Sequence, residues 1–341
     1  MFRLACRVLA LLTLTAQSGG SLNAELVRTS AAYYTALPTV VKITGLDTVL
    51  DYYQRLEDDR DRLGDPTPAG YSSGAWENTV DRIATLDLAL ANALLRDSFP
   101  DLASIRGLGA TFVRSSRDGT MQPVAVYVPP DYTPTRSLPL VVFLHGRPQT
   151  ETELLAPEFV ESLARDNDTI VIAPYGRGNY DFIDSEADVY DALAAAQHAF
   201  AVDRRRTYLM GYSMGGFSVF GVAPLHPNDW AAVMCIAGSL LGSRAQRVVA
   251  MMSRTPFYVL TGSADESIPT QYPTATAAFL RSVDIPVTFY SEAGGTHRLI
   301  TLLPILTQAW TDMLHGVVRT PVGLKGSLAL PLAAPVNPSK T

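Results

Sequence analysis

Cysteine, positive charge and long apolar runs are all scarce in this sequence of 341 residues, and each scarcity excludes a class of protein. With only two cysteines, Cys6 and Cys235, the chain cannot rely on a disulfide framework. The formal net charge is −6 and the chain has no basic cluster, which argues against a nucleic-acid partner. Beyond the N-terminus, no stretch is long and apolar enough to predict a stable membrane span.

Residues 1–24 have the pattern of a secretory signal peptide. Two arginines give a basic start, and an apolar segment follows over residues 8–16. We expect cleavage after Ala24 or Ser18, which predicts a secreted or periplasmic protein. The alternative interpretation is a short N-terminal helix of the fold.

Residues 25–105 differ in pattern from the rest of the chain. Apolar residues recur at helical spacing over residues 46–56 and 76–94, and a segment rich in Gly, Pro and Ser separates them at residues 64–74. The charge-dense residues 57–62 are expected to form a solvated face. The pattern therefore predicts an N-terminal helical extension, a pair of amphipathic helices that shapes the functional site or packs beside it.

Residues 106–318 predict an α/β domain. The segments 111–115 and 124–128 alternate like strands around Asp118-Gly119, which is a hairpin signal. Apolar strands then alternate with helical stretches, which predicts a mostly parallel sheet covered by helices on both faces. The expected strands are residues 140–144, 169–173, 207–210, 231–237, 257–260 and 287–290, and the expected helices are residues 153–165, 187–200 and 301–314. Cys235 falls in one of these strands and is expected in the core. A Pro-rich tail, residues 319–341, has no clear element.

The most informative motif is Gly211-Tyr212-Ser213-Met214-Gly215, which lies between a predicted strand and a helical pattern. In this context the motif predicts a nucleophile elbow, because the sharp turn leaves little room for side chains at Gly211 and Gly215. Ser213 is then the candidate nucleophile, and the N–H of Met214 is a candidate donor to an oxyanion. The structural alternative is a tight turn before a core helix.

The partners that a serine nucleophile requires follow later strands. A serine hydroxyl is a weak nucleophile unless a base removes its proton and an acid orients that base. Of five histidines, His297 alone follows the last predicted strand in a glycine-flanked loop. Asp265 follows the preceding strand and is the preferred acid, with Glu266 and Asp284 as alternatives. The chain order of Ser213, Asp265 and His297 is the one that α/β-hydrolases use.

A second oxyanion donor is expected in Leu144-His145-Gly146-Arg147, at the end of an apolar strand. We assign this donor to the backbone N–H of Arg147. We interpret His145 as a structural, hydrogen-bonding histidine rather than a catalytic one.

Together these motifs resemble the secreted-esterase and prolyl-oligopeptidase-like branch of the α/β-hydrolase superfamily, over about residues 107–316. The matching segments are Asp118-Gly119, Tyr127-Val128-Pro129, Leu144-His145-Gly146, Ala173-Pro174-Tyr175-Gly176-Arg177-Gly178, Gly211-Tyr212-Ser213-Met214-Gly215-Gly216, His226-Pro227, Asp265 and His297. The resemblance implies an α/β-hydrolase fold, a triad of Ser213, Asp265 and His297, and neither a cofactor nor a metal. Residues 144–149 are similar to feruloyl esterase and polyester depolymerase relatives, which commonly carry Cys where this chain has Arg147.

We therefore predict a serine hydrolase that cleaves small-molecule or polymer-derived carboxylic esters through an acyl-enzyme on Ser213. Two other enzymatic functions stay open: a serine peptidase of the prolyl-oligopeptidase type acting on small peptides, and a lipid or lactone hydrolase. A hydrolase-like binding module without activity is disfavoured, because such modules usually lack a triad member. No oligomeric state is predicted.

Overall fold

The computed structural model describes residues 19–178, 182–319 and 330–331. The first 18 residues of the predicted signal peptide and nearly all of the predicted Pro-rich tail lie outside the described residues. No helix in the described part of the chain combines the length and the apolar character that crossing a membrane requires.

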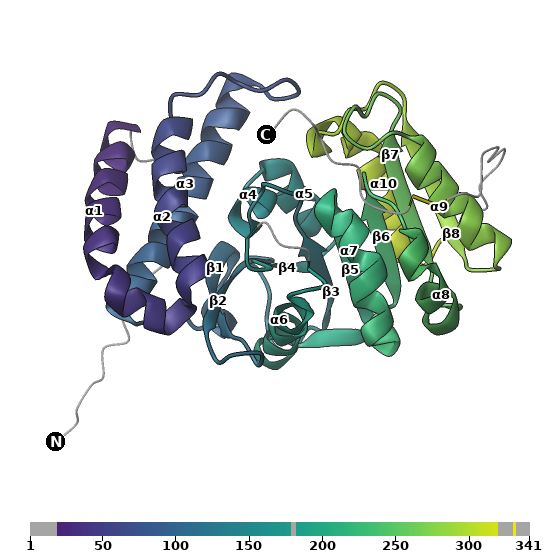
Figure 1. The fold of residues 1–341 in the computed structure, drawn as a ribbon, viewed down its shortest axis with the longest axis horizontal. Helices are drawn as coiled ribbons and strands as arrows, with labels where there is room; N and C mark the ends of the chain where they lie inside the picture. The colour runs from purple at the N-terminus through teal and green to yellow at the C-terminus, as the bar shows by residue number, and fades with distance from the viewer. Residues whose placement is uncertain (1–18, 179–181, 320–329, 332–341) are drawn as a thin grey trace.

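One eight-stranded sheet forms the centre of the molecule, with the strand order β1-β2-β4-β3-β5-β6-β7-β8 (Figure 1). β2 runs antiparallel to both β1 and β4, and every other neighbouring pair is parallel. The strands are β1 (Gly107–Arg114), β2 (Met121–Val128), β3 (Leu138–Leu144), β4 (Ile170–Pro174), β5 (Val202–Tyr212), β6 (Ala232–Ile236), β7 (Phe257–Gly262) and β8 (Val287–Glu292). The predicted α/β class, with an N-terminal hairpin and a mostly parallel sheet, is confirmed.

Helices cover both faces of this sheet. Buried side chains of α6, α7, α8 and α9 form one apolar core with the sheet, and those of α4, α5 and α10 form another on the opposite face. The bounds of these helices are α4 (Glu151–Leu155), α5 (Glu158–Asp166), α6 (Glu186–Ala199), α7 (Met214–Val222), α8 (Gly242–Met251), α9 (Gln271–Ser282) and α10 (Leu303–Leu314). Short 3-10 turns at Leu102–Ser104, Ala223–Leu225, Pro227–Asp229 and Leu299–Leu302 complete the elements.

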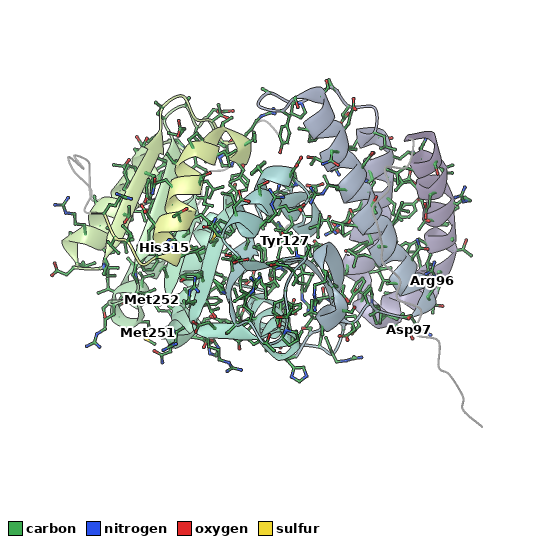
Figure 2. All side chains as sticks on the ribbon, turned by 180° about the vertical axis from the view of Figure 1, so that it is seen from behind. Arg96, Asp97, Tyr127, Met251, Met252 and His315 are labelled. Atoms are coloured by element: carbon green, nitrogen blue, oxygen red, sulfur yellow. The ribbon has the colours of Figure 1, made fainter. Side chains whose placement is uncertain are left out.

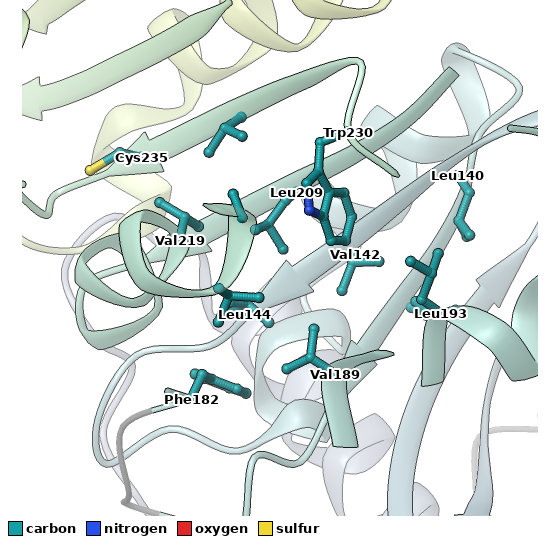
Figure 3. Packing of buried hydrophobic residues seen from close by; sticks show 14 of the residues in the cluster. Leu140, Val142, Leu144, Phe182, Val189, Leu193, Leu209, Val219, Trp230 and Cys235 are labelled. Atoms are coloured by element: carbon teal, nitrogen blue, oxygen red, sulfur yellow. The ribbon is translucent and has the colours of Figure 1, made fainter. Parts of the chain in front are cut away.

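β3 shows how the alternation of side chains along a strand serves the two cores. Val142 and Leu144 point into the core of α6 and α7, where Figure 3 shows them with Val189 and Val219. Their neighbour Phe143 points into the opposite core. Successive side chains of a strand face opposite sides, so a continuous apolar run is needed wherever both faces are buried. Cys235 of β6 is fully buried in the first core, as predicted, and this burial raises the pKa of its thiol.

The prediction of a single helix over residues 153–165 is wrong in one respect, because the structure has two helices there, α4 and α5. Pro157 is the N-cap of the second helix, and a proline provides no backbone N–H to continue the hydrogen bonds of the first. α4 begins with a capping box, in which the side chains of Thr150 and Glu153 each accept a hydrogen bond from the other residue's backbone N–H. α4 is therefore a separate short helix directly after the loop that follows β3.

The N-terminal extension contains three helices where the sequence predicted two: α1 (Gly19–Thr44), α2 (Leu46–Arg62) and α3 (Ser73–Arg96). They lie side by side next to β1 and β2 (Figure 1), and their apolar faces share one core with Ala110 and Phe112 of β1. Asp97 ends α3 in a left-handed conformation with φ 47°. Figure 2 shows Arg96 and Asp97 on the side of the molecule opposite to Met251, the last residue of α8, and Met252, which follows it.

Candidate active site

Ser213 occupies a sharp turn between β5 and α7. β5 ends at Tyr212 and α7 begins at Met214, so Ser213 alone makes the turn, with φ 53° and ψ −114°. A positive φ is uncommon for a residue with a side chain and is a source of backbone strain. The N–H of Ser213 donates to the carbonyl of Ile236 in β6 at 2.9 Å, which helps to hold the turn.

The two glycines of the motif allow backbone segments to cross. A Cβ atom on Gly211 would lie 2.1 Å from the carbonyl oxygen of Gly215, and one on Gly215 would lie 2.3 Å from the carbonyl oxygen of Leu144. Both contacts are to backbone atoms, which cannot rotate away as a side chain could. The structure therefore contains the tight strand-to-helix turn that the motif predicts.

The carboxyl ends of the parallel strands bring the candidate residues to one edge of the sheet. β5, β7 and β8 run parallel, and Ser213 follows β5, Asp265 follows β7 and His297 follows β8. Loops at this edge of an open α/β sheet are the usual location of functional groups. The three residues are far apart in sequence, and the fold places them next to each other.

Ser213, His297 and Asp265 form a continuous line of hydrogen bonds. His297 Nε2 lies 2.9 Å from Ser213 Oγ, and His297 Nδ1 lies 2.9 Å from Asp265 Oδ2. The Asp265 side chain is fully buried, whereas His297 is 20% exposed. The backbone N–H groups of Ser267 and Ile268 donate to Asp265 Oδ1 at 2.9 and 2.7 Å, so the buried carboxylate has several donors. A carboxylate beside Nδ1 favours the tautomer that carries the proton there, which leaves Nε2 free to accept the serine proton.

The structure also distinguishes the candidate acids. Glu266 is exposed, whereas the Asp265 carboxylate lies within hydrogen-bond distance of His297. Asp284 is exposed, has φ 58°, and precedes β8, so it lies at the opposite edge of the sheet from His297. Only Asp265 of the three candidates is brought to the histidine.

Tyr212 supports the loop that carries His297, and the sequence analysis did not predict this role. Its hydroxyl donates a hydrogen bond to the carbonyl oxygen of His297, and the two ring centroids lie 5.4 Å apart. Burial raises the pKa of the Tyr212 phenol, which keeps the hydroxyl protonated and able to donate. The only indication of this role in the sequence is that an aromatic residue directly precedes the serine of the motif.

Two backbone segments beside Ser213 contain the predicted oxyanion donors. Met214 is the first residue of α7, and the first N–H groups of a helix have no acceptor within that helix. The next N–H, that of Gly215, donates to the carbonyl of His145 at 3.1 Å and so joins α7 to the loop after β3. A Cβ atom on Gly146 would lie only 3.0 Å from Ser213 Cβ. The fold therefore brings Met214 and Gly146, the residue before Arg147, beside the nucleophile.

His145 is buried and forms hydrogen bonds with backbone carbonyls, as expected for a structural histidine. Its Nδ1 lies 2.9 Å from the carbonyl oxygen of Gly146, and its Nε2 lies 2.8 Å from that of Tyr175. The Phe182 ring packs against it with centroids 4.9 Å apart. The ring of His145 thus lies between the backbone carbonyls of two loops, and its N–H can donate to one of them.

Apolar and aromatic side chains flank this line of residues. Phe217 of α7, Leu241 and Ile268 form a small buried cluster on segments adjoining Ser213 and Asp265. On another side, the loop between α2 and α3 reaches the turn after His297: a Cβ atom on Gly70 would lie 2.8 Å from Ile300 Cγ2. The helical extension therefore contacts the segment that carries the candidate base.

In the described residues, no group of three or more His, Cys, Asp or Glu side chains is arranged to hold a metal ion. The arrangement of a strained serine, a histidine and a buried carboxylate is suited to nucleophilic attack with proton transfer.

Comparisons with known proteins agree with this fold. The family model described as "Putative esterase" matches residues 115–256, which leaves the three helices of the extension outside the match. No curated protein sequence matches the chain.

Several solved structures have a similar fold. A thermostable esterase has a TM-score of 0.51 and 20% identity, over 62% of this chain and 63% of its own. FphF, a fluorophosphonate-binding serine hydrolase of Staphylococcus aureus, has a TM-score of 0.51 and 17% identity, over 61% of this chain and 98% of its own. A ferulic acid esterase of Anaeromyces mucronatus has a TM-score of 0.50 and 15% identity, over 63% of this chain and 91% of its own. The chain thus spans slightly less than two thirds of the first of these proteins.

Proposed function

We propose that this chain, which has the α/β-hydrolase fold and resembles the esterases of that superfamily, is a serine hydrolase that cleaves carboxylic esters through an acyl-enzyme on Ser213. The observation that carries the proposal is the hydrogen-bonded line from Ser213 Oγ through His297 to the buried Asp265 carboxylate. The proposed substrates are small-molecule or polymer-derived esters.

The proposed reaction begins when Ser213 Oγ attacks the ester carbonyl carbon and His297 Nε2 accepts the hydroxyl proton. The N–H groups of Met214 and Arg147 stabilise the oxyanion that forms, and Asp265 stabilises the imidazolium through Nδ1. The tetrahedral intermediate then collapses, and His297 returns the proton to the departing alcohol. In the second half, water attacks the acyl-enzyme with His297 as its base, which releases the acid and restores Ser213.

We also propose that the protein is secreted and that its leader is removed after Ser18. Cleavage after Ala24 would remove Leu22, which is buried in the core of the extension. Burying one leucine side chain stabilises a fold by roughly 1.5–3 kcal/mol, so the earlier site retains more of that core.

The test of ester hydrolysis is activity of the full chain on a panel of p-nitrophenyl esters, feruloyl esters, lactones and peptide amides. We expect turnover of esters, and a fall in kcat by several orders of magnitude in Ser213→Ala. The matched control is Ser253→Ala, at an exposed serine after α8, which should retain activity. Turnover of peptide amides in preference to esters, or an active Ser213→Ala variant, would contradict the proposal.

A further inference from the structure

A buried ion pair joins the helical extension to the hydrolase domain. Arg55 of α2 donates from Nη1 and Nη2 to the two carboxylate oxygens of Glu151, each at 2.8 Å. Glu151 is the first residue of α4 and is fully buried, and Arg55 is 5% exposed. Tyr52 adds a hydrogen bond from its hydroxyl to Glu151 Oε1 at 3.0 Å. The bidentate geometry fixes both the position and the orientation of the Glu151 carboxylate.

The Arg55 guanidinium also lies against two aromatic rings. Its central carbon is 4.5 Å from the centroid of Tyr52 and 4.8 Å from that of Tyr175. Tyr175 follows β4, and its carbonyl oxygen lies 2.8 Å from His145 Nε2. The Arg55 side chain therefore contacts residues at both ends of the loop between β3 and α4. Glu151 lies at the α4 end, and Tyr175 contacts His145 at the β3 end.

The charges of this cluster favour the ionised pair. Burial alone would raise the pKa of Glu151, but the positive charge and the hydrogen bonds of Arg55 outweigh it and hold the pKa below its ordinary value. Removing one member of a buried pair leaves an uncompensated charge, whereas removing both often leaves stability unchanged. A lysine at position 55 would keep the charge but could not form the two parallel hydrogen bonds or stack in the same way.

The loop held in this way, residues 145–150, contains the proposed oxyanion donor Arg147. Two further contacts reinforce the α4 end of the loop: Thr152 Oγ1 donates to Asp87 of α3 at 2.9 Å, and Arg62 of α2 forms an ion pair with Glu153. An oxyanion donor acts only when its N–H is aimed at the developing charge, and a displacement of about 1 Å can cost about 100-fold in rate.

We infer that Arg55 is a positioning residue for catalysis, which acts through Glu151 to hold the Arg147 N–H at the oxyanion hole. The inference rests on the proposed serine-hydrolase function. It gives the helical extension a role in the chemical step, although the extension lies outside the region that the esterase family model matches.

The test is the double variant Arg55→Met/Glu151→Met, which removes both charges of the bidentate pair. Asp51, at 2.6 Å, and Asp87, at 3.6 Å, also lose the positive charge of Arg55, so folding of the variant is checked first. The matched control is Arg82→Met/Glu161→Met, which removes another ion pair between the extension and the hydrolase domain, at α5 rather than α4. We expect kcat on a p-nitrophenyl ester to fall roughly 10- to 100-fold in the first variant, with KM changed less than about threefold. The control should keep the kcat of the unmodified chain. Rates are expressed per fluorophosphonate-reactive site, so that loss of folded protein does not lower kcat.

A second measurement separates positioning from a general loss of structure. A trifluoromethyl ketone adds to the nucleophilic serine and places an anionic oxygen in the oxyanion hole, so its affinity should fall by the same factor as kcat/KM. If the double variant does not fold, Arg55→Lys is measured instead, and it should show the same effects at smaller size.

The two proposals fail in different ways. An unmodified chain that does not react with a fluorophosphonate contradicts the serine-hydrolase function itself. A reactive chain whose Arg55 variants keep both kcat and the affinity for the ketone contradicts the positioning role alone. An equal loss of kcat in the Arg82→Met/Glu161→Met control also contradicts it, because the effect would then not depend on α4.

Discussion

The buried Asp87 should make the stability of this protein depend on pH. Asp87 lies in α3 and accepts the hydrogen bond from Thr152, and its side chain lies 3.6 Å from Arg55. Burial raises its pKa from an ordinary 3.8 to about 7; Arg55 opposes the rise and Glu151 adds to it. Asp87→Asn is the informative substitution, because an amide has nearly the shape of the protonated carboxyl and can still accept the Thr152 hydrogen bond.

The sign and size of the effect follow from the two pKa values. Between about pH 4 and pH 7 the folded chain keeps a proton on Asp87 that the unfolded chain has lost, so the free energy of unfolding falls as pH rises. The slope approaches about 1.4 kcal/mol per pH unit and ends near the folded-state pKa. Between pH 5 and pH 8 this amounts to about 3 kcal/mol. Asp87→Asn lacks this contribution at both pH values.

The assay is urea unfolding at pH 5 and pH 8, followed by tryptophan fluorescence. At each pH, the free energy of unfolding of the unmodified chain is subtracted from that of Asp87→Asn. This difference should be about 3 kcal/mol larger at pH 8 than at pH 5. Asp61→Asn, at a 79% exposed side chain of α2, is the control and should match the unmodified chain at both pH values. If the difference in the free energy of unfolding between Asp87→Asn and the unmodified chain is the same at both pH values, the account of the buried cluster is wrong.

Three further predictions concern the site, the turn and the leader. Asp265→Asn should lower kcat about 10⁴-fold, because it changes the tautomer of the histidine, whereas Asp284→Asn should leave steady-state rates unchanged; the reverse order would contradict the assigned acid. Gly215→Ala should lower the melting temperature strongly, because its Cβ would meet a backbone carbonyl, whereas Gly74→Ala, which meets nothing within 4 Å, should not. N-terminal sequencing of protein recovered from its native host should begin near Gly19, and an intact Met1 on cytosolic protein would refute secretion.

Much of the hydrolase domain could be predicted from the sequence because its strands are buried on both faces. Such strands must be continuous apolar runs, and all six predicted parallel strands and the hairpin are present. Each of Ser213, Asp265 and His297 follows one of these strands, which predicted that the three residues lie together at one edge of the sheet. The break at Pro157 was missed because the apolar pattern continues across it.

The extension was harder to predict, because its contacts are not periodic in sequence. α1 was missed in part because its first residues were assigned to the leader and because it contains Pro38. The charge-dense residues 57–62 were expected to be a solvated face, which is wrong for Asp59, a buried residue that accepts a hydrogen bond from Arg62. The pairing of Arg55 with Glu151 joins residues 96 positions apart, and no local pattern indicates it.

The site was predictable where a motif sets the geometry and less so where tertiary contacts do. Gly211 and Gly215 leave the space that the turn at Ser213 needs, and the motif shows both of them in the sequence. The hydrogen bond from Tyr212 to the His297 carbonyl depends on how the loop after β8 folds back onto β5. That contact could be found only in three dimensions.

The central claim is that Ser213 is the covalent nucleophile, and the most direct measurement is to map its adduct. The full chain is treated with a fluorophosphonate, digested, and analysed by mass spectrometry. The account predicts one modified serine, Ser213, with loss of esterase activity in proportion to the modified fraction. Modification of a different serine that accompanies the loss of activity, or full esterase activity with Ser213 completely modified, would contradict it.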